Sequence, residues 1–186
     1  CIFDQDSVIE SEFISKLLDV YQQLEKEGFM VSAVGPRPLS RSTNKEYKGK
    51  FEVGEAFNSH ITQTRQIISS GSLLSIHAFE KIGFFKESMF IDLVDYEWCW
   101  RGNQIVFRCF IAEDVPLQHM FGKREVRLLG FRVTAPTSFR IYFQFRNYLW
   151  LLPVGYVPLY WKISNGFKLI VKFFLFPVWF LDKEYI

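Results

Sequence analysis

Cys1-Ile2-Phe3-Asp4-Gln5-Asp6-Ser7 places two carboxylates directly behind three apolar residues. Residues two apart in a strand face the same side, so Asp4 and Asp6 would leave the end of a buried strand as a pair. Two hard oxygen ligands in this position suit a hydrated Mg²⁺ or Mn²⁺ that bridges a diphosphate. The alternative is an ordinary surface turn, because Asp-x-Asp is a short and common pattern.

The next residues predict a helix followed by a strand. Ser7 is the expected N-cap, and apolar residues at steps of three and four predict one amphipathic helix that ends near Gly28. These apolar residues are Phe13, Ile14, Leu17, Leu18, Tyr21 and Leu24. Residues 29–34 are then expected to form a short buried strand that Gly35-Pro36 closes. A helix followed by a strand is half of a parallel unit, so the predicted fold class is α/β.

Further along, polar residues 37–64 lack a sustained period and predict a long loop with room for a hairpin. Residues 66–74 begin as a strand and turn through small residues toward a helix. The elements expected after this turn are a helix over 77–82 that Gly83 ends, a short strand at 90–91, a helix over 92–100 and a strand over 104–111. Glu113-Asp114 is expected to break the last strand.

Charge and aromatic residues divide the chain into two unequal parts. Residues 1–120 carry 12 Lys and Arg against 17 Asp and Glu, a net −5, whereas residues 121–186 carry 10 against 3, a net +7. Of 34 aromatic residues, 15 lie between Phe139 and Phe180. An acidic part joined to a basic, aromatic part is the balance expected of a protein that rests on an anionic membrane.

The apolar stretches near the C-terminus do not have the pattern of a membrane-spanning helix. Residues 148–161 are 14 uncharged residues interrupted by two prolines and a glycine, whereas a span needs about 20 apolar residues. Residues 167–181 contain two lysines and a proline, and a mixture of aromatic rings and amines favours the headgroup zone. The alternatives are a helical hairpin packed on the domain and an interface with another subunit.

The three cysteines, Cys1, Cys99 and Cys109, form no Cys-x-x-Cys pair. Neither a disulfide framework nor a structural zinc site is therefore expected, and a reducing, cytosolic setting is the default. The modest net charge of +2 and the absence of a nucleic-acid-binding motif give no reason to expect a nucleic-acid partner.

Three motifs follow one another in order: DQDS at 4–7, ISSGSLLS at 68–75 with GFF at 83–85, and FIDLVDYEWCWR at 90–101. This succession resembles family 2 glycosyltransferases of the GT-A fold, most closely their bacterial rhamnosyltransferase branch, from residue 1 to about residue 150. The resemblance implies a Rossmann-like mixed sheet in a catalytic domain over 1–135. It leaves a helical, aromatic-rich C-terminal extension over 136–186. The family's first, nucleotide-binding strand has no counterpart here, so we expect an N-terminally truncated domain that binds donor nucleotide poorly.

The resemblance implies a metal site. It makes Asp4 and Asp6 the pair that holds Mg²⁺ or Mn²⁺ and the diphosphate, with Asp6 the better candidate for direct contact. His119 lies at the end of the catalytic domain, where such enzymes often carry a residue that reaches the metal or the diphosphate. The alternative for His119 is a packed or surface position. A divalent ion would neutralise the charge that grows on the nucleoside diphosphate as it leaves.

The third motif supplies the catalytic candidates that the resemblance implies. Asp95 matches the general base that removes the proton from the acceptor hydroxyl, and direct attack with one base inverts the sugar. Glu97 would orient the acceptor or support the base. An acid beside Trp98 or Trp100 would be partly desolvated, which raises its pKa. The alternative is a solvated acidic helix without a catalytic role.

The predicted substrate-binding set comes from the second and third motifs. Ser70, Gly71 and Ser72 would bring backbone and hydroxyl groups beside the donor sugar, unless the segment is an ordinary tight turn. Asp92 and Trp98 complete the set.

The predicted function is transfer of L-rhamnose from dTDP-rhamnose, a nucleotide-sugar donor, to a lipid-linked saccharide acceptor during assembly of a cell-surface polysaccharide. The expected location is the cytoplasmic face of the bacterial cell membrane, as a peripheral or monotopic protein. Two alternatives stay open: a transferase of the same family that uses a UDP-hexose or a galactofuranose donor, and a non-catalytic membrane-bound fragment.

Overall fold

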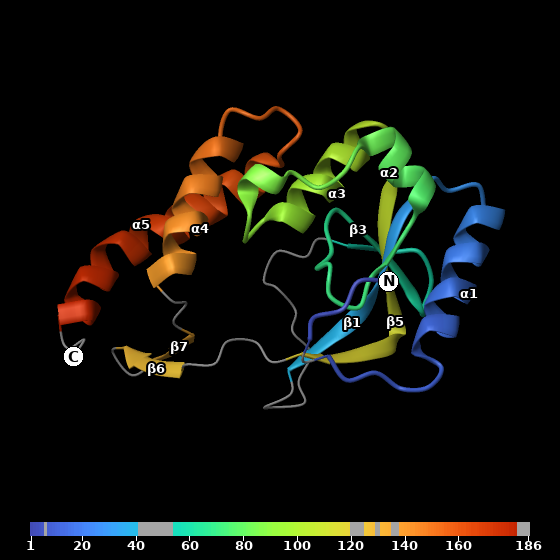
Figure 1. Ribbon diagram of the computed structural model, residues 1–186, viewed down its shortest axis with the longest axis horizontal. Coiled ribbons are helices and arrows are strands. Elements are labelled where there is room, and N and C mark those ends of the chain that lie inside the picture. The colour runs from blue at the N-terminus through green and yellow to red at the C-terminus, as the bar shows by residue number, and fades with distance from the viewer. Residues whose placement is uncertain (6, 41–53, 120–124, 129–130, 135–137, 182–186) are drawn as a thin grey trace.

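The structure is a computed structural model that describes residues 1–5, 7–40, 54–119, 125–128, 131–134 and 138–181 (Figure 1). Its main strands are β1 (Val31–Ser40), β2 (Glu55–Ala56), β3 (Ile61–Thr64), β4 (Leu73–Leu74) and β5 (Arg108–His119). Within the described ranges they form a five-stranded sheet in the order β2-β3-β5-β1-β4. The central pair, β1 and β5, is parallel and the other pairs are antiparallel. The predicted α/β class with a mixed sheet is confirmed.

Helices cover both faces of this sheet (Figure 1). Helix α1 (Phe13–Lys26) packs on one face, and α2 (Ile76–Ile82) and α3 (Val94–Gln104) pack on the other. Side chains along β5 alternate accordingly, because successive residues of a strand point to opposite faces. Phe110 and Ala112 join the core with α1, whereas Cys109 and Ile111 join the core with α2 and α3.

The central strands are longer than the sequence predicts. Strand β1 does not close at Pro36, and Glu113-Asp114 does not break β5. Instead Pro36 pairs with Ala112 while Arg37 pairs with Pro116, so β5 contains extra residues in a bulge. The bulge absorbs the irregularity that the prolines introduce into the ladder, and Arg37 forms an ion pair of 3.2 Å with Glu113 across it.

The apolar pattern of the sequence predicts which side chains of α1 are buried, but it does not predict the residue that caps the helix. In α1 the predicted residues Phe13, Leu17 and Leu24 are buried, but the helix begins at Phe13 with Glu12 as its N-cap, so the prediction that Ser7 caps it is wrong. In α2 the Ser75 hydroxyl accepts a hydrogen bond from the backbone N–H of Ala78 at 3.3 Å.

Three further predictions have different outcomes. The hairpin expected in the polar segment is present as β2 and β3, while residues 41–53 lie outside the described part. The strand expected at 90–91 is absent: a short 3₁₀ helix, η1 (Glu87–Met89), is followed by Phe90 at φ +59°. Residues 1–3 are not the end of a buried strand, since Ile2 is 38% exposed. Its backbone nevertheless donates to Ser72 at 3.1 Å and accepts from Gly71 at 2.7 Å.

The C-terminal region is attached to the α/β part through α3. Strands β6 (Glu125–Leu128) and β7 (Phe131–Thr134) form a separate antiparallel pair, and α4 (Ser138–Leu151) and α5 (Leu159–Leu181) follow. In Figure 1 these two helices lie side by side beyond α3. The Trp100 ring of α3 meets the Trp161 ring of α5 with centroids 4.8 Å apart, within a cluster that includes Leu151 and Val157.

Two features of this region bear on the sequence predictions. The predicted domain boundary at residues 135–136 lies outside the described residues. Among the helices described, none combines the length and the apolar character that crossing a bilayer requires.

Candidate active site

Asp95 lies in the first turn of α3 and faces the turn formed by residues 69–72. Its carboxylate accepts hydrogen bonds from the backbone N–H of Ser69 at 3.0 Å and of Tyr96 at 2.9 Å. Burial raises the pKa of Asp95 above its usual range, these hydrogen bonds oppose the rise, and the charge of Asp92 adds to it. The direction agrees with the expectation for a desolvated acid, and such a group is suited to accept a proton.

The turn that supports Asp95 requires a glycine. Gly71 has φ +74°, and a Cβ atom built on it would lie 2.7 Å from Cδ2 of Leu117. Ser72 is fully buried, and its hydroxyl donates to the carbonyl of Ile68 at 2.6 Å, so it holds the turn together. The turn is therefore a rigid platform between the sheet and α3.

The same turn contacts the N-terminal segment that carries the predicted metal ligands. Ser70 is 4% exposed, its hydroxyl lies 3.2 Å from the hydroxyl of Ser7, and it accepts a hydrogen bond from the backbone N–H of Asp4 at 3.4 Å. The second motif thus meets the first in space.

Of the predicted metal ligands, the structure describes one side chain. Asp4 is exposed, Asp6 lies outside the described residues, and His119 ends β5 with its backbone paired to Ser40 while its side chain is outside the described part. In the part of the chain that the structure describes, no group of three His, Cys, Asp or Glu residues could hold a metal ion. The metal site stays a prediction.

Arg140 of α4 binds an acidic residue of the third motif. Its guanidinium donates to both carboxylate oxygens of Asp92, from Nε at 3.0 Å and from Nη2 at 3.1 Å. The pKa of Arg140 is raised, first by these hydrogen bonds and further by the charges of Asp95 and Asp4. Asp4, Asp92 and Asp95 therefore share one electrostatic neighbourhood around a cation that the motifs did not identify.

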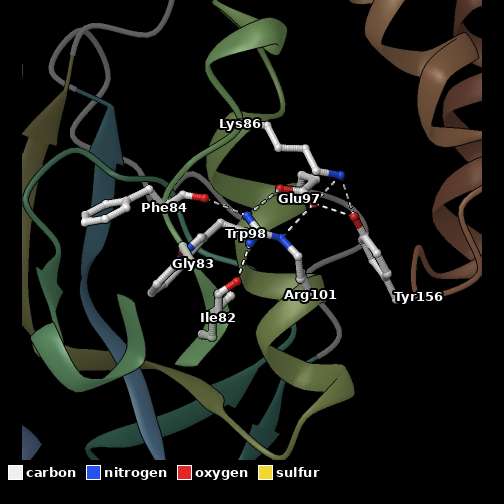
Figure 2. A network of polar contacts seen from close by, with 8 residues as sticks. All are labelled: Ile82, Gly83, Phe84, Lys86, Glu97, Trp98, Arg101 and Tyr156. Atoms are coloured by element: carbon white, nitrogen blue, oxygen red, sulfur yellow. Dashed lines mark hydrogen bonds and ion pairs between the residues drawn. The ribbon is translucent and has the colours of Figure 1, made fainter. Parts of the chain in front are cut away.

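Glu97 lies in a different, structural network (Figure 2). It is fully buried, and its Oε1 is 3.0 Å from Nε of Arg101 and 3.0 Å from Nζ of Lys86. The hydroxyl of Tyr156 also donates a hydrogen bond to Oε1 of Glu97, and the guanidinium of Arg101 donates to the backbone carbonyls of Ile82 and Phe84. Burial by itself would raise the pKa of Glu97, but the bonds from Arg101, Tyr156 and Lys86 outweigh burial and lower it. We assign Glu97 to this network rather than to the substrate.

Trp98 is a core residue. Its side chain is 1% exposed, and its indole N–H donates to the carbonyl of Gly83 at 2.8 Å (Figure 2). Its ring packs on Phe79 and Phe85, with centroids 5.0 and 5.4 Å away. A side chain in this position has no free surface for a ligand, so its predicted place in the substrate-binding set has no support in the structure.

A cavity of about 500 Å³ opens where α3 meets β3 and the connection between α4 and α5. Its polar lining includes Arg65, Asn103, Arg108 and Tyr156. None of the predicted site residues whose side chains the structure describes lines it. We place the candidate active site at Asp95, because the acidic residues, the small-residue turn and Arg140 converge there.

Comparison with known proteins finds a relative whose name describes a glycosyltransferase, the class of enzyme that the motifs resemble. The chain is 33% identical over 176 residues to a protein of Shigella flexneri named dTDP-rhamnosyl transferase RfbF. The match covers 88% of this chain and 56% of that protein, so the chain spans about half the length of its curated relative. No protein-family model matches the chain, and no solved structure matches it.

Proposed function

We propose that the protein carrying this chain is a glycosyltransferase of family 2 with a GT-A fold. It transfers L-rhamnose from dTDP-rhamnose to a saccharide on a lipid carrier during assembly of a cell-surface polysaccharide. The similarity to the Shigella flexneri protein supports the class of reaction and the donor. The observation that carries the proposal is the position of Asp95. It is half-buried with a raised pKa, and it accepts a hydrogen bond from the turn at residues 69–72, which also contacts the Asp4 segment.

In this proposal Asp95 is the general base. Its carboxylate takes the proton from the acceptor hydroxyl as the oxygen attacks the anomeric carbon of the donor sugar. One base and one direct displacement invert the configuration of that carbon, because no enzyme nucleophile intervenes. Arg140 offsets the negative charge that Asp4, Asp92 and Asp95 place in this neighbourhood.

Asp4 and Asp6, with His119, are proposed to hold Mg²⁺ or Mn²⁺. Carboxylate oxygens fit the preference of these hard cations, and the ion supplies charge neutralisation for the leaving diphosphate. Removal of divalent ions with EDTA should abolish transfer, and added Mn²⁺ should restore it. Undiminished transfer in EDTA would argue against a metal-dependent reaction.

We also propose that α5 lies on the cytoplasmic face of the membrane. Phe167, Ile170 and Phe174 of this helix are 58–69% exposed, and Lys162 and Lys168 belong to the same helix. Exposed apolar side chains on a helix that also carries lysines suit an anionic lipid surface. Such a surface would also hold the lipid-linked acceptor.

Sedimentation with vesicles tests the membrane proposal. Vesicles of phosphatidylglycerol and phosphatidylethanolamine should bind the full-length protein, and a Phe167→Asp/Phe174→Asp variant should stay in solution. The control is Ile76→Asp on α2, where the native side chain is 79% exposed but remote from α5 in sequence. Equal sedimentation of all three proteins would remove α5 from the membrane contact.

The reaction itself is tested on the full-length protein with Mn²⁺, membrane lipid acceptors and a panel of nucleotide sugars. Sugar incorporation from dTDP-rhamnose alone would support the complete proposal. Incorporation from a UDP-hexose or a UDP-galactofuranose would keep the class of reaction and replace the donor. No incorporation from any donor, with the acceptor verified, would overturn the catalytic proposal in favour of a non-catalytic membrane-bound protein.

A further inference from the structure

Asn147 of α4 is fully buried and binds the segment that precedes α3. Its amide nitrogen lies 3.0 Å from the carbonyl oxygen of Met89, 2.8 Å from that of Ile91 and 2.8 Å from that of Asp92. An amide has two N–H groups, so at least one of them is shared between two acceptors. One side chain therefore satisfies three carbonyl groups of a short loop.

Arg146 fixes the orientation of the Asn147 amide. Its Nε and Nη2 donate to the amide oxygen of Asn147 at 3.1 and 2.9 Å, which directs the amide nitrogen toward the loop. The same Nη2 also donates to the carbonyls of Ser88 at 2.7 Å and Met89 at 2.9 Å. The guanidinium lies over the ring of Trp150, 4.3 Å from its centroid.

The segment held by these two residues has an unfavourable backbone conformation. Phe90, Asp92 and Leu93 have φ of +59°, +67° and +65°, and none of them is glycine. Non-glycine residues persist in this region only where surrounding contacts fix them, and such positions gather at functional sites. Leu93 is the N-cap of α3, so the segment sets where the helix that carries Asp95 begins.

We propose that Asn147, oriented by Arg146, is a positioning residue for Asp92 and Asp95. It holds residues 88–93 in the strained conformation that directs the first turn of α3 onto the turn at residues 69–72. The inference rests on the proposed function, since it assigns Asn147 a part in placing the general base. It also makes α4 a component of the active site in addition to any membrane contact.

The test compares Asn147→Leu with a matched control, Asn165→Leu, in the full-length protein. Asn165 is a half-buried asparagine of α5 whose amide also donates to a backbone carbonyl, that of Trp161 at 3.1 Å. We expect Asn147→Leu to lower kcat about 10- to 100-fold with the donor KM changed less than about twofold, because the base is displaced but the donor site is not. The control should change neither.

Two further readouts separate positioning from general stability. Amide hydrogen exchange at residues 88–95 should accelerate in Asn147→Leu and not in Asn165→Leu. The acid limb of the kcat profile should move to lower pH, since a loosened segment admits water to Asp95 and lowers its pKa. If Asn147→Leu does not fold, Arg146→Lys tests the same arrangement, because lysine cannot bind the amide and the carbonyls together.

Each outcome decides one question. Unchanged kcat and unchanged exchange in a folded Asn147→Leu or Arg146→Lys variant would overturn the positioning role. Equal losses in Asn147→Leu and Asn165→Leu would reduce it to general stability. If the unaltered protein transfers no sugar, the proposed function fails, and the exchange at residues 88–95 still decides whether Asn147 fixes the segment.

Discussion

The two sides of α3 shift the pKa values of their carboxylates in opposite directions. On the side of the turn at residues 69–72, Asp95 accepts backbone hydrogen bonds and has a raised pKa. Two residues on, Glu97 meets two cations and a tyrosine hydroxyl and has a lowered pKa. Residues two apart on a helix do not face each other, so each acid meets different elements. The surroundings, and not the residue type, therefore decide which of the two carboxylates is the stronger base.

Replacement of Asp95 should have the largest effect. Asp95→Asn retains the shape and an acceptor for Ser69 but cannot take a proton, so transfer should fall by about 10²- to 10⁴-fold. Donor binding in the presence of Mn²⁺, measured by calorimetry, should change less than about threefold. If donor binding is lost together with transfer, Asp95 contacts the donor instead of the acceptor.

Replacement of Glu97 should affect stability instead of chemistry. Glu97→Gln leaves the charges of Arg101 and Lys86 without their buried partner, so the free energy of unfolding should fall by about 3 kcal/mol. Urea denaturation measures this change, and transfer per folded molecule should stay within about threefold. A loss of transfer as large as that of Asp95→Asn, with stability retained, would erase the distinction between the two sides of α3.

The stability difference between the native protein and Glu97→Gln should depend on pH. Because the folded-state pKa of Glu97 is lowered, ionisation of Glu97 stabilises the folded state above the pKa of the unfolded chain. This contribution is lost as pH falls through the folded pKa. Unfolding followed from neutral pH into acid should therefore show the two proteins converging, and a constant difference would mean that the charge of Glu97 contributes nothing.

The sequence identifies the elements of the site better than their contacts. Small residues predict the turn before α2, and helical spacing predicts α3, because both signals are local. The bonds from Arg140 and Asn147 to Asp92 join residues 48 and 55 positions apart, and no local pattern encodes them. The basic and aromatic pattern of α4 is compatible with lipid contact and with packing on a protein loop, so periodicity cannot separate the two.

The positions predicted wrongly have related causes. The strand expected at 90–91 relies on β-propensity, but contacts from α4 hold Phe90 at positive φ, and tertiary contacts override propensity. The sequence prediction places Trp98 in the substrate-binding set because it directly follows Glu97 in the third motif. The helix turns it into the core instead.

The smallest predicted effect concerns Tyr156, through which the connection between α4 and α5 reaches Glu97. Tyr156→Phe removes the hydroxyl that donates to Glu97 and accepts from Lys86 at 2.9 Å, and the direct ion pairs of Glu97 persist. The free energy of unfolding should fall by only about 1 kcal/mol. The control is Tyr142→Phe, where the native side chain is 61% exposed and no change is expected. A loss equal to that of Glu97→Gln would show that the ion pairs of Glu97 depend on the C-terminal region for their geometry. Residues that follow α3 in the chain would then position the carboxylates on both of its sides.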